Sequence, residues 1–193
     1  MRVLVLFAHP VETSFQAALH RTVVTALTQT GHQVDDCDLY AEGFEPVMSR
    51  AERIDYHNTG LCRKPVEGYV RRVLEAECLV VIFPVWNYGY PAILKGFFDR
   101  VFLPGVSFEL VEGKLRPTLH GIRKLGAVVT YGGARWRTVV MGDPPRRIVK
   151  RSLKAMVHPR AQTKYLALYD LNRADETARR RFTERVDRQF RNF

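Results

Sequence analysis

Apolar runs alternate with segments of helical periodicity along the whole chain. Residues 3–8 are almost entirely apolar, and the unbroken run CLVVIF at 78–83 is typical of a central parallel strand that is covered on both faces. Weaker strand patterns cover residues 33–39, 125–130 and 165–169. The hydrophobic pattern therefore predicts five strands.

Helices are predicted between these strands. Apolar positions recur at helical spacing over residues 14–30, 66–77 and 145–157. Pro91 is expected to start a further helix at its first position, and Asn172 with Asp175 resembles a capping box for the last helix.

Two segments carry weaker patterns. Residues 42–65 predict an excursion that contains a short helix, and residues 106–116 predict a hairpin or an extended loop around Glu112 and Gly113.

Five strands that alternate with helices predict an α/β fold, a doubly wound parallel sheet in a single domain over residues 1–193. Right-handed crossovers restrict the topology, and five strands favour the flavodoxin-like order 2-1-3-4-5. In that order the ligand crevice lies at the carboxyl ends of the first and third strands. The turns that follow Ala8 and Phe83 are therefore expected to form the site.

Composition supports a globular protein without membrane insertion. Hydrophobic residues make up 46% and charged residues 26% of the 193. No apolar run approaches the roughly 20 residues that span a bilayer. The first apolar run leads into Pro10 and Glu12 without a small-residue cleavage site, so we interpret it as the first strand of a cytoplasmic protein. Three scattered cysteines fit a reducing compartment and predict no metal site.

The formal charge of +10 raises the question of a nucleic-acid partner. Much of the excess is local, in residues 173–191 and in a cluster of five basic residues over 146–154. Such runs are usually solvated helix faces, and no recognisable nucleic-acid-binding motif accompanies them, so we expect no nucleic-acid partner. The surplus can still attract anionic ligands such as phosphorylated cofactors.

The turn after the first strand has the sequence HPVETSF. A helix N-terminus offers unpaired N–H groups and partial positive charge, which suit a phosphate. Thr13 and Ser14 add hydroxyl donors, and His9 can donate to the same anion. Ser14 alone would be read as an ordinary N-cap. Their combination at the predicted crevice favours a phosphate site.

Two further turns are expected at the same edge. PVWNYGYP, residues 84–91, places Trp86 and Tyr88 beside Gly89, which suits the flat face of an aromatic cofactor. TYGGARW, residues 130–136, contains a Gly-Gly pair whose backbone amides can face a ligand. A plain turn is the alternative for the Gly-Gly pair, and sheet-edge or interface packing is the alternative for the aromatic residues.

AHPVETSF, FPVWNYGYPAILKGFFDRVF and TYGG resemble, in order and spacing, the NAD(P)H:quinone reductase family of flavodoxin-like flavoproteins. The resemblance covers roughly the first 135 residues, and PAILKGFFDRVF is its most specific part. It implies a flavin oxidoreductase, usually a homodimer with the flavin at the dimer interface.

The resemblance also implies a set of flavin-contacting residues. The first turn would hold the phosphate or pyrophosphate through His9, Thr13, Ser14, Phe15 and Gln16. The isoalloxazine ring would be lined by Pro84, Val85, Trp86, Asn87 and Tyr88. Its other edge would meet Thr130, Tyr131, Gly132 and Gly133.

The implied activity is a ping-pong cycle in which NADPH or NADH passes a hydride to the flavin, and a quinone or similar flat acceptor then takes two electrons. FAD is slightly favoured by AHPVETSF, whereas Asn87 and the modest length favour FMN. The chain departs from the family by having GARWRTVVMGDPPRR where quinone reductases carry a Tyr and a His, so no catalytic residue is assigned. Alternatives are an electron-carrier flavoprotein and a regulatory subunit of a glutathione-gated potassium efflux system.

Overall fold

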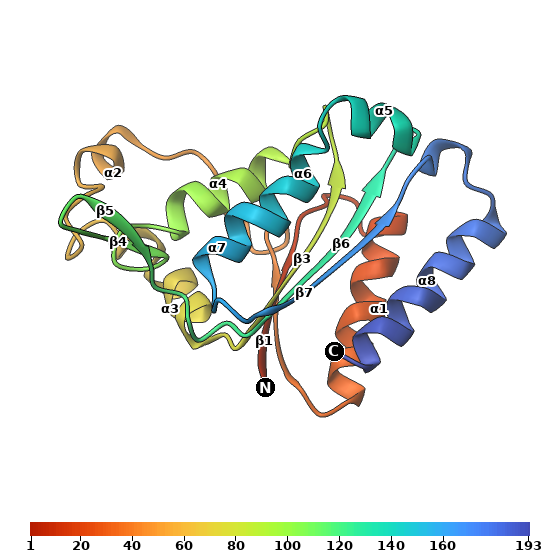
Figure 1. Cartoon of the computed structure of the whole chain (residues 1–193), viewed down its shortest axis with the longest axis horizontal. Helices are drawn as coiled ribbons and strands as arrows, with labels where there is room; N and C mark the ends of the chain where they lie inside the picture. Colours follow the sequence, from red (N-terminus) through yellow and green to blue (C-terminus); the bar gives the residue numbers. More distant parts are fainter.

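A five-stranded parallel sheet forms the centre of the computed structural model, which describes residues 1–193 (Figure 1). Its strand order is β2-β1-β3-β6-β7. Because β6 and β7 are the fourth and fifth strands of this sheet along the chain, the predicted order 2-1-3-4-5 is confirmed. The strands are β1 (Arg2–Phe7), β2 (Gln33–Asp38), β3 (Cys78–Val85), β6 (Lys124–Tyr131) and β7 (Gln162–Leu168).

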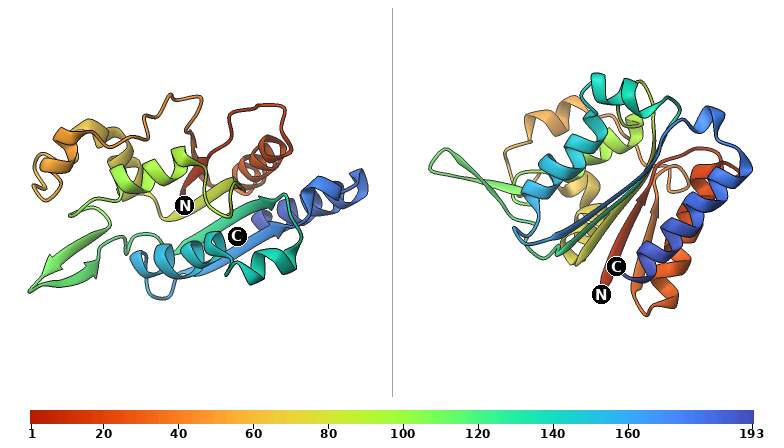
Figure 2. Two further views of the ribbon diagram at one scale, coloured as in Figure 1. Left: turned by 90° about the horizontal axis from the view of Figure 1, so that it is seen from above. Right: turned by 45° about the vertical axis from the view of Figure 1, so that its right-hand side comes forward.

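Helices cover both faces of the sheet, as the two views of Figure 2 show. One face is covered by α1 (Phe15–Gln29) and α8 (Glu176–Arg191). The other carries α3 (Glu67–Glu75), α4 (Ala92–Val101) and a helical run made of α6 (Pro144–Arg147), the π-helix η2 (Ile148–Leu153) and α7 (Lys154–Met156). Each face has its own apolar cluster, of 17 and 31 buried residues respectively.

The remaining elements are short. The predicted hairpin is confirmed and consists of the antiparallel strands β4 (Phe108–Val111) and β5 (Lys114–Pro117). The excursion contains α2 (Arg50–Ile54) and the 3-10 turn η1 (Lys64–Val66). A helix that the sequence pattern did not predict, α5 (Arg135–Val140), follows β6, and the 3-10 turn η3 (Leu171–Arg173) precedes α8. None of the helices is both long and apolar enough to cross a bilayer.

Helix starts confirm one expected cap and correct two details. The Ser14 side chain accepts a hydrogen bond from the Ala17 N–H, so Ser14 is the N-cap of α1. Asn172 does not cap α8, because it belongs to η3; Asp175 is the cap and accepts from the Ala178 N–H. Pro91 is the N-cap of α4 rather than its first helical residue.

The excursion is fixed on α4 by a close backbone contact and a buried ion pair. A Cβ atom at Gly96 would lie 2.3 Å from the Pro46 carbonyl oxygen, so only glycine permits this approach. Arg100 forms an ion pair with Glu52, 2.6 Å between Nη2 and Oε1, and donates to the Glu45 carbonyl. These contacts position the segment that precedes α3.

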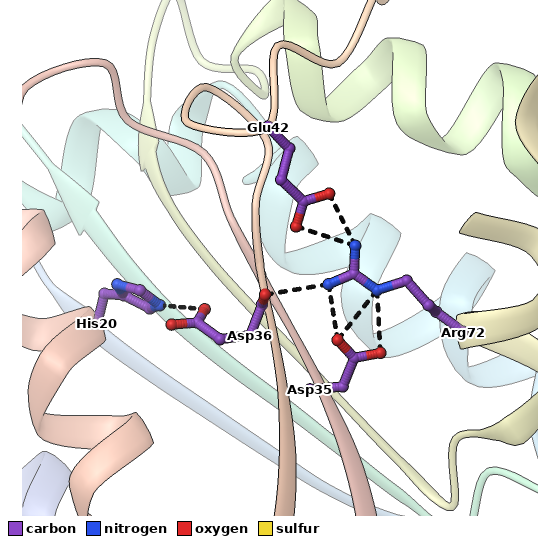
Figure 3. Close-up of polar contacts among 5 residues, drawn as sticks. All are labelled: His20, Asp35, Asp36, Glu42 and Arg72. Atoms are coloured by element: carbon purple, nitrogen blue, oxygen red, sulfur yellow. Dashed lines mark hydrogen bonds and ion pairs between the residues drawn. The ribbon is translucent and has the colours of Figure 1, made fainter. Parts of the chain in front are cut away.

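A second ion-pair network joins α3 to β2. The Arg72 guanidinium donates to both oxygens of Asp35, to both oxygens of Glu42 and to the Asp36 carbonyl (Figure 3). Beside it, His20 Nε2 lies 2.7 Å from Asp36 Oδ1. Acidic side chains on both faces of the edge strand β2 are therefore paired, Asp35 with α3 on one face and Asp36 with α1 on the other.

Candidate active site

Three turns leave adjacent strands at the same edge of the sheet. β1 pairs with β3 so that Phe7 lies opposite Ile82, and the Ala8 N–H donates to the Ile82 carbonyl at 3.1 Å. β3 pairs with β6 up to Val85 and Tyr131. Because parallel strands present their carboxyl ends together, the turns that follow β1, β3 and β6 lie side by side.

The first turn presents unpaired donors. The backbone N–H groups of Phe15 and Gln16 have no hydrogen-bond partner within the chain, and Thr13 is exposed. His9 Nδ1 accepts from the Val11 N–H at 3.0 Å, and partial burial lowers the pKa of His9. The turn therefore has the free amides that an anion at a helix N-terminus requires.

Gln16 and Thr130 have side chains that bond to the protein itself. Gln16 is 3% exposed; its Nε2 donates to the Val128 carbonyl at 3.1 Å, and its Oε1 accepts from Thr130 Oγ1 at 2.7 Å. This pair joins the first turn to the end of β6. Phe15 packs partly buried against the α1–α8 face.

The second turn is tight and strained. Trp86 and Gly89 exchange two backbone hydrogen bonds, of 3.2 and 2.8 Å, around Asn87 and Tyr88. Both central residues have positive φ, 49° and 59°, as in a type I′ turn, which normally uses glycine or asparagine. A tyrosine in this region costs free energy of order 1–3 kcal/mol. Such strain is typical of functional sites.

This turn exposes aromatic surface beside the first turn. Trp86 is 41% and Tyr88 is 40% exposed, whereas Pro84 is buried and Val85 is half-buried at the end of β3. The ring centroids of His9 and Trp86 are 6.0 Å apart. The sequence-predicted residues of the first two turns are thus brought together.

The third turn is held by the segment that follows β7. The Asp170 N–H donates to the Gly133 carbonyl at 2.8 Å, and the Asn172 amide would lie 3.2 Å from a Cβ atom at Gly132. A side chain at position 132 would therefore crowd Asn172, a neighbour that the sequence pattern did not reveal. Nothing lies within 4 Å of the corresponding position at Gly133, whose backbone N–H has no partner within the chain.

Tyr131 points away from the turn into the protein. It is 2% exposed, its hydroxyl donates to Asp143 Oδ1 at 2.7 Å, and the Tyr165 hydroxyl lies 2.5 Å from it. Burial raises the pKa of Tyr131, and the neighbouring Tyr165 and Asp143 raise it further. Tyr131 therefore stays protonated and acts as a support for the third turn.

A large cavity lies beside the second turn rather than between the three turns. It measures about 560 Å³ and is mostly apolar. Its walls come from α4, from η2 and from the excursion, and it includes Tyr90, Phe98 and Met48. The buried Tyr90 hydroxyl has no hydrogen-bond partner within the chain. An unpaired buried hydroxyl costs about 1–3 kcal/mol. The wall of this cavity therefore lacks a hydrogen-bond acceptor or donor for Tyr90 within one copy of the chain.

Comparison with known proteins identifies the family. Residues 1–158 match a family model described as flavodoxin-like fold. An uncharacterized NAD(P)H oxidoreductase, YcaK of Escherichia coli K12, is 32% identical over 142 residues, which cover 73% of this chain and 69% of the relative. Across eight of the curated relatives that it matches, the aligned segment spans 45 to 69% of their length.

Two solved structures resemble the whole chain. Smu.1420 from Streptococcus mutans UA159 has 30% identity and a TM-score of 0.85, with full coverage of both chains. The NAD(P)H:quinone oxidoreductase from Methanothermobacter marburgensis has 25% identity and a TM-score of 0.84, and covers 100% of this chain and 96% of its own.

Proposed function

The chain belongs to the flavodoxin-like fold family, and on that premise we propose that it is a flavin-dependent NAD(P)H oxidoreductase which reduces a quinone or a similar flat acceptor by two electrons. The observation that carries the proposal is the convergence of the three turns at one sheet edge, where Trp86 and Tyr88 expose aromatic surface on a strained turn.

The residues present fit a flavin. Unpaired backbone amides of Phe15 and Gln16, with Thr13 and Ser14 beside them and His9 next to Trp86, suit its phosphate. The chain of Pro84, Val85, Trp86, Asn87 and Tyr88 would line the flat ring, and the backbone of Thr130, Tyr131, Gly132 and Gly133 would line its other edge. The side chains of Gln16, Thr130 and Tyr131 would position these turns through their hydrogen bonds within the protein.

A bound flavin supplies the hydride and electron chemistry, and the protein supplies position and electrostatics. The free N–H of Gly133 would donate to negative charge on the ring edge. The Trp86 and Tyr88 rings would orient a flat molecule by stacking. In the proposed ping-pong cycle the nicotinamide donor leaves before the acceptor enters the same space.

We propose that the working form is a homodimer of which the apolar cavity along α4 forms part of the interface. A second copy would cover Phe98 and Met48 and could supply a partner for the unpaired Tyr90 hydroxyl. Sedimentation velocity tests this: Phe98→Glu should yield monomers, whereas the exposed-residue change Arg188→Glu should not. A wild-type monomer at micromolar concentration would contradict the dimer.

The three free, buried cysteines fit the cytoplasmic location that we propose. Burial raises the pKa of the Cys78 thiol to about 12, so this group is not a reactive thiolate at neutral pH.

An absorption spectrum of the purified protein, followed by anaerobic addition of NADPH or NADH, tests the function. We expect flavin bands that bleach with the donor and return with a quinone. Denaturation and chromatography of the released chromophore distinguishes FAD from FMN. A protein that takes up neither flavin would overturn the proposal. A flavoprotein that neither donor reduces would favour the electron-carrier alternative.

A further inference from the structure

A basic cavity lies next to the third turn, on the side away from β3. It measures about 310 Å³ and is lined by arginines from two helices: Arg135, the first residue of α5, and Arg146 and Arg147 of α6. Asp143 and Tyr169 complete its polar lining. In Figure 1, α5 lies beyond the end of β6, and Tyr169 directly follows β7, so the cavity is at the same sheet edge as the three turns.

The three guanidinium groups form no ion pair with any carboxylate. Arg135 lies over the Tyr169 ring at 6.0 Å, and Arg146 lies over the Tyr165 ring at 5.3 Å. Arg147 packs on Gly142, where a Cβ atom would be 3.3 Å from Nη1. These ring and backbone contacts hold the guanidinium groups without a carboxylate partner.

The carboxylate in the lining offsets only part of this charge, and it forms no ion pair with the arginines. Asp143 Oδ1 accepts from the Tyr131 hydroxyl and Oδ2 accepts from the Tyr169 hydroxyl, at 2.7 and 3.3 Å. Asp143 has a φ of 44°, in the left-handed region that residues other than glycine rarely adopt. Three positive groups against one negative group leave the cavity with a formal charge of +2.

We propose that this cavity binds a phosphate group of a substrate that enters the neighbouring three-turn site, the phosphorylated nicotinamide dinucleotide above all. Arginine forks match phosphate oxygens in bidentate geometry. A small concave site with three of them suits one compact anion and excludes a duplex backbone. The substrate assignment rests on the proposed function, whereas the anion site itself rests only on the cavity and its charges.

The binding test uses the purified protein with its native complement of flavin, titrated calorimetrically at constant ionic strength. The probes are 2′,5′-ADP, 5′-AMP and inorganic phosphate. We expect 2′,5′-ADP to bind more tightly than 5′-AMP. Arg146→Gln and Arg147→Gln should each weaken 2′,5′-ADP at least about tenfold, because a hydrogen bond to a charged group is lost. The matched control Arg151→Gln, which removes an exposed charge outside the cavity, should change the affinity less than about twofold.

The outcomes distinguish a failure of the proposed anion site from a failure of the proposed flavin-dependent function. Equal weakening by Arg147→Gln and Arg151→Gln would mean unspecific attraction and would overturn the proposal, as would the absence of any probe binding. Phosphate binding without discrimination between 2′,5′-ADP and 5′-AMP would support the anion site and overturn the 2′-phosphate assignment. A protein without flavin that still binds 2′,5′-ADP at Arg147 would support the site while the proposed function fails. Far-UV spectra of each variant check that it is folded.

Discussion

Two regions of this molecule use arginine in opposite ways. On the β2 side, Arg72 is surrounded by Asp35, Glu42 and the Asp36 carbonyl, so that its donors are satisfied within the protein (Figure 3). In the cavity beside α5 and α6, Arg146 and Arg147 have no carboxylate partner. The net charge of +10 cannot reveal this difference, because a paired and an unpaired arginine each add one positive charge to the total.

The difference lies in what satisfies the donors. A guanidinium that is paired inside the protein contributes to the folded state and is costly to remove, since its partners remain buried and unpaired. A guanidinium that is held in place by ring and backbone contacts but carries no partner is available to a ligand. The pairing state of each arginine therefore predicts whether a substitution affects stability or binding.

The largest effect is expected at Arg100, the most buried of the paired arginines. Its side chain is 9% exposed and that of Glu52 is 13% exposed. Arg100→Met should lower the free energy of unfolding by about 3–5 kcal/mol, because Glu52 is left as a buried unpaired charge. Chemical denaturation measures this, and Lys95→Met, which breaks an exposed ion pair, should cost at most about 1 kcal/mol. Equal losses in both variants would contradict the distinction.

The same ion pair gives a pH dependence. Burial opposes ionisation of Glu52, but hydrogen bonds from Ser49 and Arg100 prevail and lower its pKa below 4.5. The extra stability is therefore fully present above pH 4.5 and is lost as pH falls through the lowered pKa. Denaturation midpoints from pH 7 to 3 should converge for wild type and Glu52→Gln. Parallel curves would show that Glu52 is not responsible.

The strained backbone of Tyr88, at the proposed flavin site, also trades stability against binding. Tyr88→Gly should raise the free energy of unfolding by up to about 1 kcal/mol, because glycine adopts a φ of 59° without strain. The same change should weaken flavin binding, since an exposed aromatic surface is lost. Denaturation without flavin and a flavin titration measure the two effects. Reduced stability would mean that Tyr88 contributes packing that outweighs its strain.

The smallest effect on stability is expected in the basic cavity. Arg147→Gln should change the free energy of unfolding by less than about 0.5 kcal/mol, because no carboxylate is left unpaired. Thermal melts with and without 2′,5′-ADP measure this, and the nucleotide should stabilise the wild type more than the variant. A loss comparable to that of Arg100→Met would place Arg147 among the structural arginines.

The strand order and the meeting of the three turns could be predicted because they follow from local patterns and a general rule. Apolar runs such as 78–83 mark buried strands, and parallel strands place their carboxyl ends at one edge. α5 could not be predicted in this way. Its apolar residues Val139 and Val140, with Met141 after it, stay more than half exposed, so no buried stripe marks the helix.

Side-chain roles at the site were harder to predict than its location. Gln16 and Thr130 are 114 residues apart, and their mutual hydrogen bond depends on the tertiary fold. The spacing to Asp175 predicts a cap at Asn172, whereas Asn172 packs against Gly132. The spacing of the five basic residues over 146–154 predicts a solvated helix face. Arg147 and Arg151 are both exposed, yet only Arg147 lines a cavity, a distinction that depends on α5 and Tyr169.

The missing side chain at Gly96 has a consequence beyond α4. Pro46 rests directly on that glycine, and Met48, two residues further on, forms part of the wall of the large apolar cavity. Adding one methyl group at position 96 would push this connection outward and reshape the hollow without altering any residue that lines it. A substitution at Gly96, which does not line the cavity, would therefore change the shape of the cavity.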